Sequence, residues 1–343
     1  MLTFVEDKSA QELVGIYSNT SKSHKPEATL YFTHEIKPEK ENVAPARGVL
    51  ALHKDSLKKI NKISQASFEL ICEMLDSGAE PEVGEPLRAE YWDLKQVYER
   101  SLRREMYLGD QDDLYFEHNL PRDREKWGGN FLMVGNSGAG KTYWVVQLLL
   151  RYLRATKPHS RRTIIYISPE AEIDITLKPL KDNRFAFNTF FIDVSADAVK
   201  KSSLSAAEYY QTNVESVIEK HGERACIIYD DFMDAAPGME QLLRRDYIHG
   251  LRTARHKKTT VVSLVHSYAS GRNTSQAIQS VKFAVMFPAS SKSRIVMFMR
   301  DHLHIPIKEA KELVHKFAKI DRWMVIRMHS PVAIYNSKYL LLI

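Results

Sequence analysis

The sequence has few cysteines and no long hydrophobic segment. Only Cys72 and Cys226 occur among the 343 residues, and their wide separation suggests no disulfide framework, which fits a reducing compartment. No run of about eighteen apolar residues is present, so we expect no membrane span. The first residues lack the basic and apolar regions of a secretory signal, so we expect none. What remains is ordinary globular composition, with 44% hydrophobic and 27% charged residues and room for two domains.

The charge is divided unevenly along the chain. Residues 1–120 contain 15 Lys and Arg against 22 Asp and Glu, a net charge of −7. Residues 121–343 contain 34 basic against 21 acidic side chains, a net charge of +13. A strongly basic domain attracts polyanions, so a nucleic-acid partner is favoured over a generic solvated surface.

Residues 1–120 are predicted to form a smaller α+β domain of unknown role. Alternation and apolar spacing indicate two strands and two helices, separated by a turn-rich acidic linker. The strands are expected at 27–33 and 48–53, the helices at 55–76 and 87–106, and the linker at 77–86. No recognisable catalytic pattern occurs in this domain.

Residues 121–343 are predicted to form an α/β domain, because apolar strands alternate with helical segments there. This alternation is typical of a mainly parallel sheet covered by helices. Strands are expected at 130–134, 162–168, 186–193, 225–229, 259–265, 283–287, 293–299, 323–328 and 332–335, and helices at 143–153 and 205–220. The last two strands are joined by His329-Ser330-Pro331 as a hairpin.

The eight residues that follow the first of these strands match the phosphate-binding pattern G-x-x-x-x-G-K-[ST] at every fixed position. A buried strand precedes them and a long apolar helix follows, so main-chain N–H groups and the helix N-terminus converge on one phosphate group. Lys141 is expected to contact the β- and γ-phosphates of ATP, and Thr142 to hold Mg²⁺. The residues are Gly135, Asn136, Ser137, Gly138, Ala139, Gly140, Lys141 and Thr142.

Two carboxylates stand at the end of the strand predicted at 225–229. An acid at the tip of a neighbouring parallel strand can reach Mg²⁺ near Thr142, usually through water, so this role is assigned to Asp230. The next acid, Asp231, is expected to polarise the attacking water. The alternative for Asp231 is a helix cap.

Three further features are candidates at the same site. Arg255, with Arg252 as second choice, precedes the strand at 259–265 and is a candidate arginine finger acting on a neighbouring subunit. The alternative is a basic helix end that complements its own dipole or contacts DNA phosphates. His266 ends that strand and is a candidate γ-phosphate sensor or an ordinary strand-end histidine. The polar loop 267–276 is either a DNA-gripping loop or a plain surface loop.

Together, the glycine loop, Asp230-Asp231, and Arg255-His256 before a strand ending in His266-Ser267 resemble the FtsK–HerA superfamily. The pattern is most like that of genome-packaging ATPases of double-stranded DNA viruses with double-jelly-roll capsids. A strand ending in Ser168-Pro169 and the hairpin near 323–336 are also similar. The resemblance covers 128–300 well and 301–343 loosely, and it does not cover 1–120. Where that family most often has Gln and Glu, this chain has His266 and Asp231.

The resemblance implies a RecA-like core with the additional strand, in which the sensor strand lies between the glycine-loop strand and the acidic strand. It also implies a ring-shaped homo-oligomer, a hexamer or pentamer, that uses ATP and Mg²⁺ to move double-stranded DNA into a preformed capsid. Capsid-vertex proteins are then further expected partners. The expected location is the host cytoplasm or nucleus, or the virion, for a viral protein, and the cytoplasm for a cellular one.

Five alternatives remain open at this stage. A cellular HerA-like pump shares the same motifs, and so does a phage-extrusion ATPase, although the latter usually carries a membrane span. A nucleotide switch such as a GTPase needs an N-K-x-D segment, which the sequence lacks. A small-molecule kinase would usually carry an Arg-rich lid. A scaffold with a degenerate site is the non-enzymatic alternative, although Lys141, Thr142 and Asp230 are intact.

Overall fold

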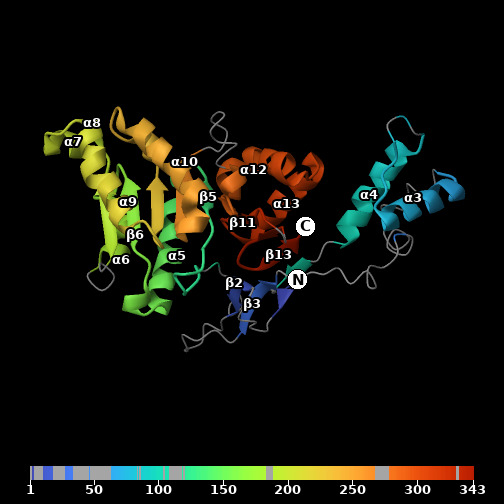
Figure 1. Cartoon of the computed structure of the whole chain (residues 1–343). Coiled ribbons are helices and arrows are strands. Elements are labelled where there is room, and N and C mark those ends of the chain that lie inside the picture. The colour runs from blue at the N-terminus through green and yellow to red at the C-terminus, as the bar shows by residue number, and fades with distance from the viewer. Residues whose placement is uncertain are drawn as a thin grey trace. The chain divides into compact units, whose positions relative to one another are not determined.

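The chain is seen in a computed structural model, whose helices and strands are drawn in Figure 1. Its contacts divide it into two compact units: Leu2–Thr33 with Tyr107–Leu340, and His34–Met106 with Met1 and Leu341–Ile343. The structure describes residues 2–3, 11–17, 28–33, 46, 63–82, 84, 86–102, 105–107, 118, 120–182, 188–266, 278–329 and 332–343.

The unit around His34–Met106 contains two helices, α3 (Gln65–Ser77) and α4 (Arg88–Leu102). Helix α3 starts at its cap, because the Ser64 side chain accepts a hydrogen bond from the Ser67 main-chain N–H, and it ends at Gly78, whose φ is 74°. The helix predicted at 55–76 is therefore wrong at residues 63 and 64, which are not helical, and its part at 55–62 lies outside the described residues. The second predicted helix is too long, since strand β4 (Glu105–Tyr107) follows α4. A small core includes Ile71, Tyr91 and Leu94.

A separate three-stranded antiparallel sheet is made by the first strands of the chain, in the order β1-β3-β2. They are β1 (Leu2–Thr3), β2 (Gln11–Tyr17) and β3 (Ala28–Thr33). The strand predicted at 27–33 is thus confirmed, whereas the one predicted at 48–53 lies outside the described residues.

The main sheet contains the order β13-β12-β11-β10-β5-β9-β8-β6-β7. Its neighbours from β10 to β7 pair in parallel, and β10, β11 and β12 pair antiparallel. This confirms the predicted α/β class with a mainly parallel sheet. The strands are β5 (Phe131–Val134), β6 (Ile164–Ser168), β7 (Thr189–Asp193), β8 (Cys226–Asp230), β9 (Thr260–Val265), β10 (Phe283–Met286), β11 (Met324–Arg327), β12 (Ala333–Tyr335) and β13 (Tyr339–Leu342).

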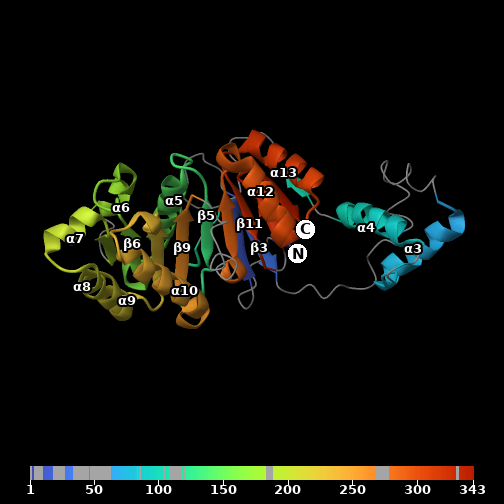
Figure 2. The ribbon, with the colours of Figure 1, turned by 90° about the horizontal axis from the view of Figure 1, so that it is seen from above.

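Helices cover both faces of the parallel part of this sheet, as Figure 2 shows. On one face lie α5 (Lys141–Ala155) and α6 (Lys178–Lys181), and on the other α8 (Ala206–Tyr210), α9 (Ser216–His221) and α10 (Met239–Lys257). Right-handed crossovers explain this division, because the chain moves outward from β5 to β6 and β7 but returns inward from β7 to β8 and β9. Helix α7 (Ala196–Ser202) and a π-helical turn (Gln211–Glu215) complete the return, so residues 205–220 are helical as predicted.

Residues 293–299 are helical, which corrects the predicted strand. They belong to α12 (Pro288–Leu303), whose buried side chains include Ile295, Val296, Phe298 and Met299. Spacings of one, three and four residues bury one face of a helix, whereas a strand would bury alternate residues. Helix α13 (Ile307–Ile320) follows, and the predicted hairpin of β11 and β12 is confirmed.

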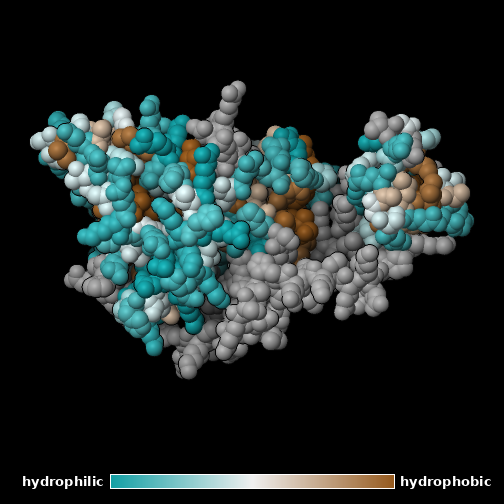
Figure 3. Space-filling view, viewed as in Figure 1, coloured by the Kyte–Doolittle hydropathy of each residue, from teal (hydrophilic) through white to brown (hydrophobic). Residues whose placement is uncertain are grey.

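Hydrophilic side chains cover most of the surface over α7 to α10 on the face shown in Figure 3. Among the helices of the described residues, none combines the length and apolarity needed to cross a bilayer.

Candidate nucleotide site

The glycine loop joins β5 to α5 at the carboxyl edge of the sheet, where α/β proteins bind ligands. Gly138 and Gly140 have φ values of 73° and 105°, a region that L side chains rarely adopt. A Cβ at Gly135 would lie 3.0 Å from both Ala139 and Phe287. The loop therefore needs glycine at these positions to place its N–H groups at the start of the fifteen-residue helix α5.

Lys141 is held in place by the loop that it follows. Its side chain is only 6% exposed, and its Nζ donates a hydrogen bond of 2.9 Å to the Gly135 carbonyl and lies 3.5 Å from the Asn136 carbonyl. Carbonyl oxygens hold the ammonium group without neutralising it. The positive charge is therefore available to the phosphates of a nucleotide.

Thr142 and Asp230 face each other across the loop. The Thr142 hydroxyl lies 3.5 Å from Asp230 Oδ2, and the Tyr166 hydroxyl donates a hydrogen bond of 2.5 Å to the same oxygen. Burial raises the pKa of Asp230 to about 7, the Tyr166 hydrogen bond opposes this rise, and the charge of Asp231 adds to it. Hydroxyl and carboxylate oxygens are ligands that Mg²⁺ prefers, and a buried carboxylate gains from a nearby cation, so these residues fit the predicted ion.

Asp231 has a strained backbone and an unsatisfied oxygen. Its φ and ψ of 43° and 36° lie in the left-handed region, which is unfavourable for a side chain other than glycine by about 1 kcal/mol. Among the described residues no hydrogen-bond partner reaches its buried Oδ1, and its Oδ2 lies 3.4 Å from His266 Nε2. The Asp231 side chain as a whole is 30% exposed, so its carboxylate next to the phosphate loop is suited to take a proton from a water molecule.

His266 connects the lysine and the acid. Its Nδ1 lies 3.5 Å from Lys141 Nζ, while its other ring nitrogen faces Asp231. It immediately follows β9, which lies between β5 and β8 in the sheet. The structure therefore brings Lys141, Thr142, Asp230, Asp231 and His266 together at one edge, and their catalytic roles stay predictions.

Arg255 lies away from this site in the same chain. Helix α10 leaves the carboxyl edge after β8 and ends just before β9 begins, so its exposed last-turn residue Arg255 lies at the amino edge. The strands between the edges hold five and six residues, a separation of about 16–20 Å. Any contact of Arg255 with a γ-phosphate thus requires another chain. The loop predicted at 267–276 lies outside the described residues.

Three contacts at this edge were not expected from the sequence. Tyr166 binds Asp230, Arg294 donates a hydrogen bond of 2.9 Å to the His266 carbonyl, and the Asn136 side chain donates one of 3.0 Å to the Ser290 carbonyl. A tyrosine within the apolar strand β6 was a signal for the first contact. The other two depend on α12, no part of which was predicted as a helix.

Tyr166→Phe is expected to weaken the use of Mg²⁺ more than the chemical step. Without its hydroxyl, Asp230 loses the hydrogen bond that favours its ionised form, and the Mg²⁺ concentration for half-maximal hydrolysis should rise about tenfold. Steady-state hydrolysis over a Mg²⁺ titration measures this. The matched control is Tyr209→Phe, which removes a 2.8 Å hydrogen bond to the Asp193 carbonyl on β7 and should leave the Mg²⁺ dependence unchanged. If the Mg²⁺ dependence of Tyr166→Phe is unchanged, Tyr166 does not support the metal site.

Comparisons with known proteins give only distant similarity. No family model and no curated protein matches the chain. A solved structure of the genome packaging NTPase B204 from Sulfolobus turreted icosahedral virus 2 with ATP-gammaS is 12% identical, with a TM-score of 0.38, covering 63% of this chain and 98% of that one. The cytoplasmic domain of the Thermomonospora curvata Type VII secretion ATPase EccC is 11% identical, with a TM-score of 0.38, covering 69% and 28%.

Because these identities and TM-scores are low, the function is inferred below from the site and the sequence. Within the sheet, β9 separates the loop-bearing strand β5 from the acidic strand β8. The chain is therefore an α/β protein with a P-loop at the carboxyl edge of a mainly parallel sheet, and its strand order is the one that the resemblance to the FtsK–HerA superfamily implies.

Proposed function

We propose that this chain is a Mg²⁺-dependent ATPase that moves double-stranded DNA, and that its task is to package a viral genome into a preformed capsid. The observation that carries the ATPase part is the cluster at the sheet edge. Within the described part of the chain, the buried Lys141 is contacted by main-chain carbonyl oxygens and a histidine, and the same histidine lies 3.4 Å from Asp231. A switch or scaffold does not need a strained acid in this position.

The residues of the chain have separate tasks in this proposal. The loop N–H groups and Lys141 hold the β- and γ-phosphates, Thr142 and Asp230 hold the metal ion, and Asp231 accepts a proton from the attacking water. When bound, Mg²⁺ neutralises charge that develops on the phosphates. His266 links Lys141 to Asp231, so it is placed to report whether the γ-phosphate is present.

Charge and motif support the DNA part. Residues 121–343 carry a net charge of +13, far more than one nucleotide requires. The Arg255-His256 segment before β9 and the strand-end polar residue are typical of the packaging ATPases that the sequence resembles. A cellular DNA pump of the same superfamily is the second candidate, since it would use the same site.

Linear duplex DNA is expected to stimulate ATP hydrolysis at least about tenfold at low salt. Binding to phosphates releases counterions, so the stimulation should decrease steeply between about 50 and about 200 mM salt. Lys141→Ala should abolish hydrolysis with and without DNA, because the γ-phosphate loses its principal cation. The measurement is phosphate release with each protein over a salt series.

Displacement of a third strand from a DNA triplex then tests movement along the duplex. ATP hydrolysis that DNA does not stimulate would contradict the translocase proposal. Stimulation by DNA without displacement of the third strand would also contradict it. Packaging into a capsid is separated from cellular pumping by binding to empty capsids of a double-jelly-roll virus, which only the packaging ATPase should show.

A further inference from the structure

Two isoleucines next to the nucleotide site are almost fully exposed. Ile173 and Ile175 are 75% and 86% exposed, and they flank Asp174 in the segment that follows β6. The segment is well anchored, because Leu177 is fully buried and the Asp174 side chain accepts a hydrogen bond of 2.7 Å from the Thr176 main-chain N–H. The two apolar side chains are therefore presented on a fixed surface.

Acidic residues alternate with these isoleucines along the chain, and the Lys181 ammonium group donates a hydrogen bond of 2.9 Å to the Glu172 carbonyl. Glu170, Glu172 and Asp174 lie in the same segment, and residues 169–176 contain no lysine or arginine. We call residues 169–176 the acidic isoleucine loop. Its charge reaches the nucleotide site, since Asp174 helps to raise the pKa of Asp230.

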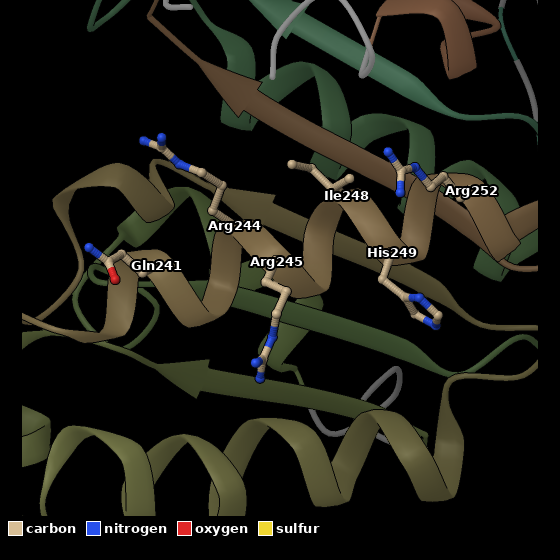
Figure 4. Close-up of a pocket in the computed structure, with 6 residues that line it drawn as sticks. All are labelled: Gln241, Arg244, Arg245, Ile248, His249 and Arg252. Carbon is tan, nitrogen blue, oxygen red and sulfur yellow. The ribbon is translucent and has the colours of Figure 1, made fainter. Parts of the chain in front are cut away.

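A groove of opposite charge runs along α10. Figure 4 shows its side chains in two rows, with Arg244, Ile248 and Arg252 on one side of the helix and Arg245 and His249 on the other. Gln241 completes the lining. We call these six residues the α10 groove. It combines one isoleucine with several cationic groups, the inverse of the acidic isoleucine loop.

The two surfaces cannot meet within one chain. The acidic isoleucine loop leads into the turn Ile175–Leu177, which packs with α5 and α6 on one face of the sheet, whereas α10 covers the opposite face. Complementary patches on opposite faces produce a head-to-tail contact between copies, which closes into a ring when the rotation allows.

We propose that the acidic isoleucine loop of one copy docks into the α10 groove of a second copy of this chain. Ile173 and Ile175 pack against Ile248, and the carboxylates of Glu170 and Glu172 face Arg245, since Arg244 already forms an ion pair of 2.5 Å with Glu240. Arg252, considered above as a finger, belongs to this groove, so the contact brings cations towards the nucleotide-binding edge of the neighbour. Only the approach of these cations to the neighbour's nucleotide site rests on the proposed function. The docking itself requires no ATP hydrolysis.

DNA is the other polyanion that the α10 groove would attract, but it explains fewer observations. Phosphates would bind the arginines, yet they would not cover Ile248 or the two exposed isoleucines, and the acidic isoleucine loop repels them. A second copy accounts for both surfaces at once. Loss of DNA binding without a change of mass is therefore the result that identifies the groove as a DNA surface instead.

Charge reversal tests the proposal in a way that a folding defect cannot imitate. Glu172→Arg and Arg245→Glu should each weaken self-association at least about tenfold, because like charges then meet at the contact. An equimolar mixture of the two variants should associate as wild type does, since every alternating contact again joins opposite charges. The readout is the mass of the assembly, measured by sedimentation in the presence of ATP. Each variant is also made together with Lys141→Ala, so that the measured mass does not depend on ATP hydrolysis.

Cross-linking locates the contact. Cys72 and Cys226 are buried, so a short thiol cross-linker should join Ile173→Cys to Ile248→Cys in a mixture and should not join either variant to itself. Monomers at all concentrations, failure of the mixed variants to associate, or no cross-linked dimer would each overturn the proposal. Failure of the ATPase would leave all of these results unchanged, so the two ideas are tested separately.

Discussion

Asp231→Asn is expected to lower the rate of ATP hydrolysis by about 10²–10⁴ while leaving the affinity for ATP nearly unchanged. The substitution keeps the size of the side chain but removes its ability to accept a proton. Asparagine tolerates the left-handed backbone of this position as well as aspartate does, so the free energy of unfolding should change by less than about 0.5 kcal/mol. Single-turnover hydrolysis, nucleotide binding and denaturant unfolding measure the three quantities.

The matched control is Asp234→Asn, three residues further along the same turn. Asp234 is exposed, and its main-chain N–H donates a hydrogen bond to the Asp231 carbonyl, so the variant removes a nearby charge without removing the unsatisfied oxygen. Its hydrolysis rate should equal that of the wild type. If Asp231→Asn hydrolyses ATP at a near-normal rate, another group activates the water, and His266 becomes the first residue to test.

Asp230→Asn is expected to abolish Mg²⁺-dependent hydrolysis and yet stabilise the chain without nucleotide at neutral and alkaline pH. The pKa of Asp230 is raised from 3.8 to about 7, mainly by burial, so the folded state binds this proton more tightly than the unfolded state does. The free energy of unfolding therefore decreases as the pH rises from about 4 to about 7. The difference of about three pKa units sets an upper limit of about 4 kcal/mol on the loss.

Because asparagine does not titrate, the stability of the variant should not show this decrease. Urea unfolding of both proteins at pH 5 and pH 8 without Mg²⁺ measures the effect, which should be larger at pH 8. Addition of Mg²⁺ and ATP should stabilise the wild type more than the variant, since only the wild type offers a carboxylate to the ion. Equal stability of the two proteins at pH 8 would show that Asp230 is ionised there without a stability penalty.

Both predictions reflect a conflict between stability and function at the sheet edge. A buried carboxylate and a left-handed aspartate are unfavourable in the folded chain by itself. In the proposed ATPase, a bound cation would offset the cost of burying Asp230, and the reaction with water would use the strained Asp231.

Much of the core was predictable because its signals are local. The strand, glycine loop and helix around residues 131–155 form one continuous segment, and their order alone determines where the phosphate loop lies. The strand that ends in Asp230 and Asp231 is equally local. The error at 293–299 arose where local evidence was ambiguous, since a short apolar run with buried neighbours fits either a strand or a helix.

The sequence by itself determined the α/β class, the phosphate loop and the two acids, because each depends on residues that are neighbours in the chain. Only the tertiary structure decided that His266 bridges Lys141 and Asp231, that Tyr166 binds Asp230, and that Asn136 reaches Ser290. These partners are 35 to 154 residues apart. Their meeting depends on the strand order β5-β9-β8-β6 and on the helices that cover each face, which arise from packing of the whole sheet and not from any local pattern.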